Sequence, residues 1–369
     1  MTRVVLAPDS FKGTITAADA ATALAEGWAT VDPAAEFVHR PMADGGEGTV
    51  SAFEAAVVGA TRMPVTVDGP AGRRIDTSWL LLPPTADAPA GTAVVDLGST
   101  SGIELLTELR PWDADTTGLG QAMAAALDHG VSRLVVGIGS SASTDGGTGM
   151  LAALGARFLD AAGTPVARGA RGLDDIVSVD LSGLRAAPEV RVLTDVTNPL
   201  TGPRGAAAVF GPQKGLRAGE DIAAVDDGLR RLAALLGIDP EREGNGAAGG
   251  TGAALVAWGG ILAPGAAEVA DLIGLAEAIA DADVVVTGEG SYDGQSGDGK
   301  VPSFLAGLAS EAGTLAMIAA GRITADADTA LFAASASLTD LAGSSDAALA
   351  EPGRWLREAG AVLARAAAV

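Results

Sequence analysis

The segment Asp283-Val-Val-Val-Thr-Gly-Glu-Gly-Ser-Tyr-Asp-Gly294 joins a short apolar run to a polar sequence rich in glycine. The apolar run predicts a buried β-strand, and the glycines and acids predict the loop that follows it. The same arrangement occurs four more times, at residues 7–13, 41–49, 137–147 and 194–202. Because ligands bind beyond the carboxyl ends of strands in open parallel sheets, five such loops predict one polar site. Glycine and aspartate also collect in ordinary turns, but their recurrence in five loops favours a functional interpretation.

Strands and helices alternate along most of the chain, which is typical of an α/β fold with a parallel sheet. We expect strands at residues 3–7, 36–40, 92–96, 133–137, 191–194, 283–287, 315–319 and 330–334, and helices at residues 16–31, 47–58, 119–130 and 354–367. Two further strands, 62–67 and 74–82, flank a Gly-Pro-Ala-Gly turn and predict an antiparallel hairpin. The predicted architecture is a Rossmann-like parallel sheet domain of residues 1–60 plus 275–369. A second, mixed α/β domain of residues 61–274 is inserted into it.

The composition excludes several classes of protein. Hydrophobic residues make up 48% of the 369 residues, which excludes an intrinsically disordered chain. The absence of cysteine excludes disulfides, thiolate zinc sites and iron–sulfur clusters, and two histidines are too few for a histidine-rich metal site. The net charge of −22 repels a nucleic-acid backbone, so we expect no nucleic-acid partner.

The sequence predicts neither a secretory signal nor a membrane anchor. Only five apolar residues precede Pro8, which is too short for the core of a signal peptide. The longest uncharged run, residues 244–267, is rich in glycine and contains Pro264, whereas a membrane-spanning helix needs about 20 apolar residues. We therefore expect no contact with a membrane and a cytoplasmic location.

Lysine is rare and occurs only beside glycine. The chain has three lysines, Lys12, Lys214 and Lys300, against 21 arginines. A compact, mobile ammonium group suits a phosphate or a carboxylate, so this placement predicts anion-binding lysines. Lys300 completes a G-x-x-x-x-G-K pattern, but Val301 stands where a P-loop has Ser or Thr, so the segment predicts a phosphate cradle and not a true P-loop.

The sequence also bears on other classes of function. The pattern Gly137-x-Gly139-x-x-Ala142 after a strand imitates a dinucleotide fingerprint, although residues 145–149 place a second glycine cluster where the helix of that motif should run. It supports an alternative hypothesis, an NAD-dependent hydroxyacid dehydrogenase. No G-x-S-x-G pattern occurs and neither histidine accompanies a candidate nucleophile, which argues against a hydrolase. A non-catalytic protein that binds small acids is a third hypothesis.

Carboxylates dominate the polar loops. They include Asp9, Asp44, Glu47, Asp145, Asp195, Glu289 and Asp293. Phosphoryl transfer to an alcohol needs Mg²⁺ held by carboxylates, cations on the phosphates, and a carboxylate near the attacking hydroxyl group. This inventory predicts a phosphotransferase, whereas any one of these acids by itself could be an ordinary solvated side chain.

Taken together, the loops resemble those of the type I glycerate kinase family. The resemblance is carried, in chain order, by Ala-Pro-Asp-Ser-Phe-Lys (7–12), Ala-Asp-Gly-Gly-Glu-Gly-Thr (43–49), Gly-Ile-Gly-Ser-Ser-Ala-Ser (137–143), Asp-Val-Thr-Asn-Pro-Leu-Thr-Gly-Pro (195–203), Val-Phe-Gly-Pro-Gln-Lys-Gly (209–215), Gly-Ala-Ala-Gly-Gly (246–250), Thr-Gly-Glu-Gly (287–290) and Gly-Lys-Val-Pro (299–302). It implies ATP-dependent phosphorylation of D-glycerate to 2-phospho-D-glycerate, with the active site in the cleft between two α/β domains. The chain departs from the family at Ser291, where Arg is common, and at Asp298, where His is common.

The hypothesis assigns roles to the loop residues. The expected catalytic residues are Lys12, Asp44, Glu47, Asp195 and Glu289. The expected ATP-binding residues are Ser10, Gly45, Gly46, Ser140, Ser141, Asn198, Lys214, Gly288, Gly290 and Lys300. Asp195 and Asp293 are the candidate Mg²⁺ ligands. The expected partners are D-glycerate and ATP, and a homodimer is one assembly that we consider.

Overall fold

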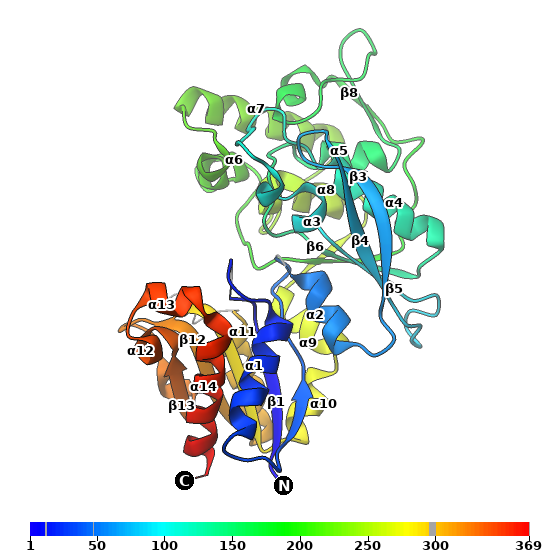
Figure 1. Ribbon diagram of the computed structural model, residues 1–369. Helices are drawn as coiled ribbons and strands as arrows, with labels where there is room; N and C mark the ends of the chain where they lie inside the picture. The colour runs from blue at the N-terminus through cyan, green and yellow to red at the C-terminus, as the bar shows by residue number, and fades with distance from the viewer. Residues whose placement is uncertain (12, 47, 295–299, 369) are drawn as a thin grey trace. The chain divides into compact units, whose positions relative to one another are not determined.

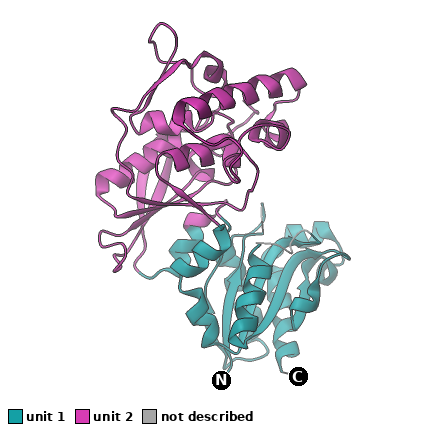
Figure 2. Ribbon diagram, turned by 180° about the vertical axis from the view of Figure 1, so that it is seen from behind, with its two compact units in different colours: residues 1–44, 51–58, 264–369 teal, residues 45–50, 59–263 magenta. Residues whose placement is uncertain are grey.

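The computed structural model describes residues 1–11, 13–46, 48–294 and 300–368. The chain forms two compact units, each built from more than one segment (Figure 2). Unit 1 comprises Met1–Asp44, Ser51–Val58 and Pro264–Val369, and unit 2 comprises Gly45–Val50 and Gly59–Ala263. The predicted domain division, with residues 61–274 as an inserted domain, stays a prediction, because compactness alone does not define a domain that folds by itself.

Unit 1 contains a five-stranded sheet whose neighbouring strands are all parallel (Figure 1). The strand order is β13 (Ala334–Ser337), β12 (Leu315–Ile323), β11 (Val284–Tyr292), β1 (Arg3–Pro8) and β2 (Glu36–His39). From β1 the chain first goes to one side, to β2, and later fills the other side with β11, β12 and β13. The strand order therefore reverses between β1 and β11, which is where open α/β sheets bind ligands.

Helices cover both faces of this sheet. Those with most or all of their residues in unit 1 are α1 (Ala17–Ala29), α2 (Thr49–Ala56), α9 (Gly265–Leu272), α10 (Leu275–Ala280), α11 (Val301–Ala312), α12 (Leu338–Ala342), α13 (Ser345–Ala350) and α14 (Pro352–Ala367). Leu24 of α1 and Leu356 of α14 share a buried core with Val4 and Val286 of the sheet. Helix α11 packs against β11 and β12 and against α10. The predicted parallel α/β arrangement is confirmed.

Two glycines allow the first and the last long helix to pack closely. A Cβ atom on Gly27 of α1 would overlap the carbonyl oxygen of Arg357 in α14, and one on Gly360 would overlap that of Leu24. Only the lack of side chains at these positions lets the two backbones approach this far. The Arg357 guanidinium also pairs with Glu26 across the same contact. Segments near the two ends of the chain thus complete one layer of unit 1.

Unit 2 contains a six-stranded mixed sheet. Its order is β10 (Ile261–Ala263), β9 (Glu189–Leu193), β6 (Arg133–Gly137), β5 (Thr92–Asp96), β4 (Arg74–Leu82) and β3 (Thr61–Asp68). The pairs β3–β4 and β4–β5 are antiparallel and the other pairs are parallel, which confirms the predicted hairpin and the mixed sheet. A separate antiparallel pair is formed by β7 (Arg157–Leu159) and β8 (Ser178–Asp180).

The α-helices of unit 2 are α3 (Gly98–Ser101), α4 (Thr117–His129), α5 (Thr148–Ala153), α6 (Ala206–Phe210), α7 (Gly219–Leu236) and α8 (Thr251–Ala257). Helices α4 and α7 have 13 and 18 residues, and the others have seven or fewer. Leu119 and Met123 of α4 and Leu229 of α7 are fully buried in one core with Leu134 of β6. Within the part of the chain that the structure describes, no helix is both long and apolar enough to cross a membrane.

The structure extends strand β11 beyond the end that the sequence predicts. Strand β11 runs to Tyr292, so Gly288, Glu289 and Gly290 lie within a strand and not in a loop. Glycines are typical of turns, but here they allow the backbones of β11 and β12 to approach each other closely. A Cβ atom on Gly288 would overlap the carbonyl oxygen of Ala319 in β12.

Candidate active site

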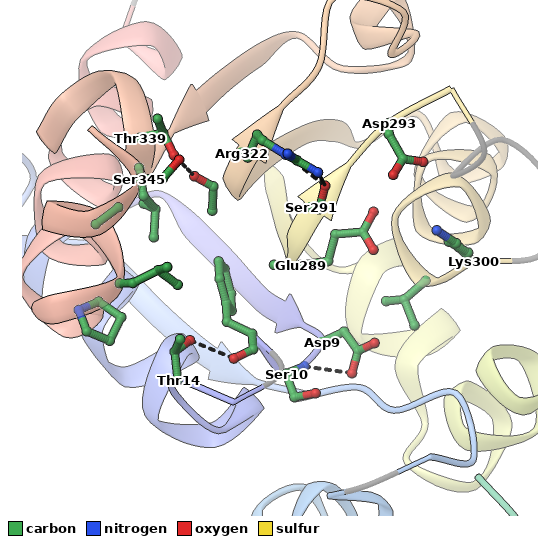
Figure 3. Close-up of a pocket in the computed structure, with 18 of the residues that line it drawn as sticks. Asp9, Ser10, Thr14, Glu289, Ser291, Asp293, Lys300, Arg322, Thr339 and Ser345 are labelled. Carbon is green, nitrogen blue, oxygen red and sulfur yellow. Dashed lines mark hydrogen bonds between the residues drawn. The ribbon is translucent and has the colours of Figure 1, made fainter. Parts of the chain in front are cut away.

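A pocket of about 560 Å³ lies in unit 1 (Figure 3). It is lined by Asp9, Ser10, Phe11, Thr14, Asp44, Glu289, Gly290, Ser291, Asp293, Lys300, Val301, Gly321, Arg322, Leu338, Thr339, Ser345, Ala348, Leu349 and Pro352. Asp9 directly follows β1, and Glu289 belongs to the last part of β11. The pocket therefore lies beyond the carboxyl ends of the two strands at which the strand order reverses.

Acidic side chains gather on one side of the pocket. Figure 3 shows Asp9, Glu289 and Asp293 on this side, with Lys300 beside them. Asp9 is only 8% exposed, and its Oδ1 accepts a hydrogen bond of 2.6 Å from the backbone N–H of Ser10. Lys300 is the N-cap residue of α11, so the first turn of that helix starts at the pocket wall.

Hydroxyl groups and apolar side chains form the other side. Thr14 Oγ1 donates to the carbonyl oxygen of Phe11 at 2.6 Å, and Thr339 Oγ1 donates to that of Gly321 at 2.9 Å. Figure 3 shows Thr14, Thr339 and Ser345 on this side of the pocket. Sequence reasoning missed these residues, because they lie outside the five glycine-rich loops from which the site was predicted.

Arg322 is a further residue that sequence reasoning missed. It lies in β12 opposite Ser291 of β11, and its Nε and Nη2 atoms are 3.3 Å and 3.2 Å from the Ser291 Oγ. The predicted strand at residues 315–319 ends before Arg322, so the sequence did not predict that this residue lies in the sheet. The strand continues to Ile323 and brings the guanidinium to the pocket.

The glycine pair after Asp44 packs against the central strands of unit 2. Gly139 N–H donates to the carbonyl oxygen of Gly45 at 3.0 Å. A Cβ atom on Gly45 would lie 2.5 Å from the carbonyl oxygen of Leu193, and Gly45 also has a positive φ of 91°. These glycines allow the segment after Asp44 to meet the ends of β6 and β9.

Lys214 is buried inside unit 2. Its Nζ donates to Ser141 Oγ and to the Ser143 carbonyl oxygen, both at 2.5 Å, and the residue is 2% exposed. Burial lowers the pKa of this ammonium group to about 7, opposed by the nearby charge of Asp145. The described contacts of Lys214 are with the loop after β6, so it positions that loop from within.

Three other predicted residues lie on the loops that follow β6 and β9 in the six-stranded sheet of unit 2. Ser140 follows β6, is exposed, and has a positive φ of 59°. Asp195 follows β9 and is exposed. Asn198 lies further along that loop, and its Nδ2 donates to the carbonyl oxygen of Arg204 at 2.8 Å.

The predicted site residues thus divide between the two units. Unit 1 brings Ser10, Asp44, Glu289, Gly290, Asp293 and Lys300 to one pocket, and Gly288 lies in β11 beside it. Unit 2 contains Gly45, Gly46, Ser140, Ser141, Asp195, Asn198 and Lys214. Lys12, Glu47 and Asp298 lie outside the described residues. The roles assigned to all these residues stay predictions.

The dinucleotide pattern at residues 137–142 does not have the structure that the fingerprint requires. After β6 the chain forms no helix until α5 begins at Thr148, whereas the fingerprint opens a helix within the motif. Gly139 serves the contact with the next backbone segment, because a Cβ atom there would overlap Gly46. The dehydrogenase hypothesis is therefore not favoured.

A parallel α/β unit with acids and cations at the carboxyl ends of its strands is typical of enzymes that act on small anionic molecules. The sequence profile of the glycerate kinase family matches residues 4–368, so the chain belongs to that family and is an enzyme. The glycerate 2-kinase of Escherichia coli (strain K12) is 39% identical over 335 residues, covering 88% of this chain and 86% of that protein.

Two further comparisons agree with this assignment. The glycerate kinase of Bacillus subtilis (strain 168) is 37% identical over 337 residues, covering 88% of this chain and 86% of that protein. A crystal structure of a Salmonella typhimurium LT2 protein assigned as glycerate kinase 2 superposes with a TM-score of 0.84 at 38% identity, covering 99% of this chain and 97% of that one. The fold and the family resemblance expected from the sequence are confirmed.

Proposed function

We propose that this enzyme transfers the γ-phosphoryl group of ATP to D-glycerate and releases 2-phospho-D-glycerate and ADP. The observation that carries the proposal is the pocket of unit 1, where four carboxylates and two cations line the carboxyl end of a parallel sheet. Phosphoryl transfer needs this combination of charges, because catalysis consists mainly of positioning and of electrostatic stabilisation. Family membership supplies the substrate class.

The proposed reaction breaks one bond and forms one. The bond between the γ-phosphorus and the oxygen that bridges to the β-phosphate breaks, and its electron pair stays on ADP. The C2 hydroxyl oxygen of D-glycerate forms the new bond to the γ-phosphorus. The proton of that hydroxyl passes to a carboxylate, for which Glu289 and Asp44 are the candidates among the lining residues.

The charge of the pocket favours a nucleotide that arrives with Mg²⁺. The described lining residues include Asp9, Asp44, Glu289 and Asp293 against Lys300 and Arg322, so a bare triphosphate would meet a net negative pocket. No cluster of three or more acids or histidines placed to hold a metal ion occurs among the described residues. This donor set suits Mg²⁺, which binds one or two carboxylates together with substrate phosphates and water. When bound, Mg²⁺ would neutralise the charge that develops on the phosphates.

The remaining assignments belong to the same proposal. Asp293, with Asp195 as the alternative candidate, would hold Mg²⁺, and Lys300 would neutralise a phosphate. The ATP-binding roles predicted for Ser140, Asn198 and Lys214 stay part of the proposal, with Lys214 acting through Ser141. A cytoplasmic location and a homodimer stay predictions.

The test is the release of ADP from ATP in a coupled assay with Mg²⁺, with and without D-glycerate. We expect ADP release that depends on D-glycerate, and no release with lactate at matched concentration if the C3 hydroxyl contributes to recognition. Omitting Mg²⁺ should abolish the reaction. Absence of glycerate-dependent ADP at millimolar substrate would refute the proposed function.

A further inference from the structure

The pocket of unit 1 has two sides of different chemistry. Figure 3 shows Glu289, Asp293 and Lys300 on one side and Thr339 and Ser345 on the other. The lining also includes apolar residues from the two helices that carry these hydroxyl groups: Leu338 lies in α12 with Thr339, and Ala348 and Leu349 lie in α13 with Ser345. A three-carbon acid with two hydroxyl groups has no apolar surface to place there. The second side therefore suits a different ligand, or a different part of a larger one.

Arg322 lies between these two sides (Figure 3). Among the described residues, its guanidinium donates to the Ser291 hydroxyl through Nε and Nη2, and it has further N–H donors beyond these two. Among the described residues no carboxylate lies within ion-pair distance of Arg322, although the pocket contains four. Arg357, also in unit 1, is by contrast paired with Glu26. Because Arg322 forms no ion pair with a described carboxylate of its own pocket, its positive charge is available to an anionic group of a ligand.

Leu349 is the second residue of the lining that bears on the identity of the ligand. Its side chain is 59% exposed at the end of α13, next to Pro352 at the start of α14. Exposure of a large apolar side chain costs hydrophobic free energy that a flat aromatic ligand would recover by covering it. The volume of about 560 Å³ is also in the range of pockets that hold ligands much larger than a three-carbon acid.

We infer that unit 1 holds the nucleotide, with Arg322 on its phosphate chain and the side formed by Leu349, Pro352, Thr339 and Ser345 on its nucleoside. The inference rests on the proposed function and goes beyond it, because it assigns the nucleotide to one unit and to residues that no loop motif marked. Arginine suits this role because its planar fork of N–H donors matches two phosphate oxygens at once. The hydroxyl groups of Thr339 and Ser345 would bind the polar atoms of the ribose or of the base.

The experiment compares ligands that carry and lack phosphate. Binding of the non-hydrolysable analogue AMP-PNP with Mg²⁺, and of adenosine, is measured by calorimetry on the full chain. Arg322→Ala should weaken AMP-PNP binding by about tenfold or more and leave adenosine binding unchanged. Leu349→Asp should weaken both ligands. Arg365→Ala, which removes an exposed arginine of α14 outside the pocket lining, serves as the matched control and should change neither.

Steady-state kinetics give the second readout. Arg322→Ala should raise the KM for ATP by about tenfold or more and leave the KM for D-glycerate within about twofold. Arg322→Lys should recover part of the loss, and Arg322→Gln, which keeps a donor to Ser291, should behave like Ala. The melting temperature of each variant confirms that it is folded, and Gln replaces Ala in every comparison if the Ala variant is not.

The outcomes separate the inference from the proposed function. A raised KM for D-glycerate with an unchanged KM for ATP would place the acceptor carboxylate at Arg322 and overturn the inference, while the kinase activity would stand. Unchanged AMP-PNP binding in both Arg322 variants would overturn it as well. If the wild-type enzyme released no glycerate-dependent ADP, the proposed function would fall, and the calorimetry would still decide whether unit 1 binds the nucleotide.

Discussion

The ammonium nitrogen of Lys214 lies 2.5 Å from the hydroxyl oxygen of Ser141, inside unit 2. The same nitrogen lies 2.5 Å from the carbonyl oxygen of Ser143, whose hydroxyl donates to Asp145 at 2.9 Å. A lysine from the turn after α6 thus holds the loop that follows β6. Because the loop bears the predicted site residues Ser140 and Ser141, the burial of Lys214 links the stability of unit 2 to the shape of its polar loops.

This burial makes the stability of the protein depend on pH. The pKa of Lys214 falls from 10.5 to about 7 on folding, so between these values the unfolded chain binds a proton that the folded chain lacks. The free energy of unfolding should therefore rise with pH across this window, and the full cost of burying the charge is present below about pH 7. Compared with Lys214→Met, the wild type should gain about 2 kcal/mol between about pH 7.5 and 9. Urea denaturation of both proteins across this range measures the difference.

The exposed Arg73 provides the control for this titration. Arg73→Gln also removes one positive charge, but arginine does not lose its proton in proteins, so its difference from the wild type should stay constant with pH. A constant difference for Lys214→Met as well would show that the lysine keeps its charge in the folded state.

Substitution of Asp145 should lower the free energy of unfolding more than substitution of most other residues in unit 2. This fully buried carboxylate accepts hydrogen bonds from the backbone N–H and the hydroxyl of Thr116, at 3.0 and 2.7 Å, and from Ser143 and the N–H groups of Gly147 and Gly149. Asp145→Asn turns one acceptor into a donor that faces other donors, and should cost about 2 to 3 kcal/mol of unfolding free energy. Chemical denaturation measures this cost.

Asp76 offers a matched comparison on the surface. Asp76→Asn changes an exposed carboxylate that accepts one hydrogen bond from Thr66, and should cost less than about 0.5 kcal/mol. Equal costs at the two positions would contradict the role given to the buried carboxylate.

The same substitution should have opposite effects at two helical glycines, one in the contact of α1 with α14 and the other in α11. Gly27→Ala would push a Cβ atom into the backbone of Arg357 and should destabilise unit 1 by about 2 to 3 kcal/mol. Gly307→Ala in α11 meets no atom within 4 Å and should stabilise the protein by about 0.5 to 1 kcal/mol, because alanine favours a helix. Melting temperatures that moved in the same direction would show that the helices do not approach each other as closely as described.

Lys300 should matter for activity more than for stability. It lines the acidic side of the pocket at the start of α11, where its charge would act on a phosphate. Lys300→Ala should lower kcat/KM by well over about tenfold with little change in melting temperature, and Lys300→Arg should restore part of the activity. An unchanged kcat/KM in the alanine variant would remove Lys300 from the site.

Much of the fold was predictable because its signals are local. The apolar run at residues 92–96 and the one at residues 133–137 coincide with β5 and β6, and the turn at residues 69–72 places the hairpin of β3 and β4. In each case a short β-branched run or a glycine turn specifies the element without help from the rest of the chain.

The parts that were missed depend on contacts between distant segments. Gly288 and Gly290 predicted a loop, since nothing near them in the sequence shows that β12 approaches their backbone. The same extension of paired strands brings Ser291 opposite Arg322, 31 residues later in the chain. Motifs could therefore find the acidic side of the pocket, whereas Arg322 became visible only when the strands were paired, and Thr339 only when α12 was placed beside Gly321 of β12.

The identity of the product tests the central claim most directly. Phosphorus NMR without proton decoupling, on a mixture of the enzyme, ATP, Mg²⁺ and D-glycerate, shows both the transfer and its position. Transfer to the C2 oxygen places the phosphorus beside one proton, so we predict loss of the γ-phosphate signal of ATP and growth of a phosphomonoester doublet. A triplet would mean that the C3 hydroxyl is the acceptor and would contradict the proposed product. A spectrum in which ATP persists would contradict the kinase activity itself.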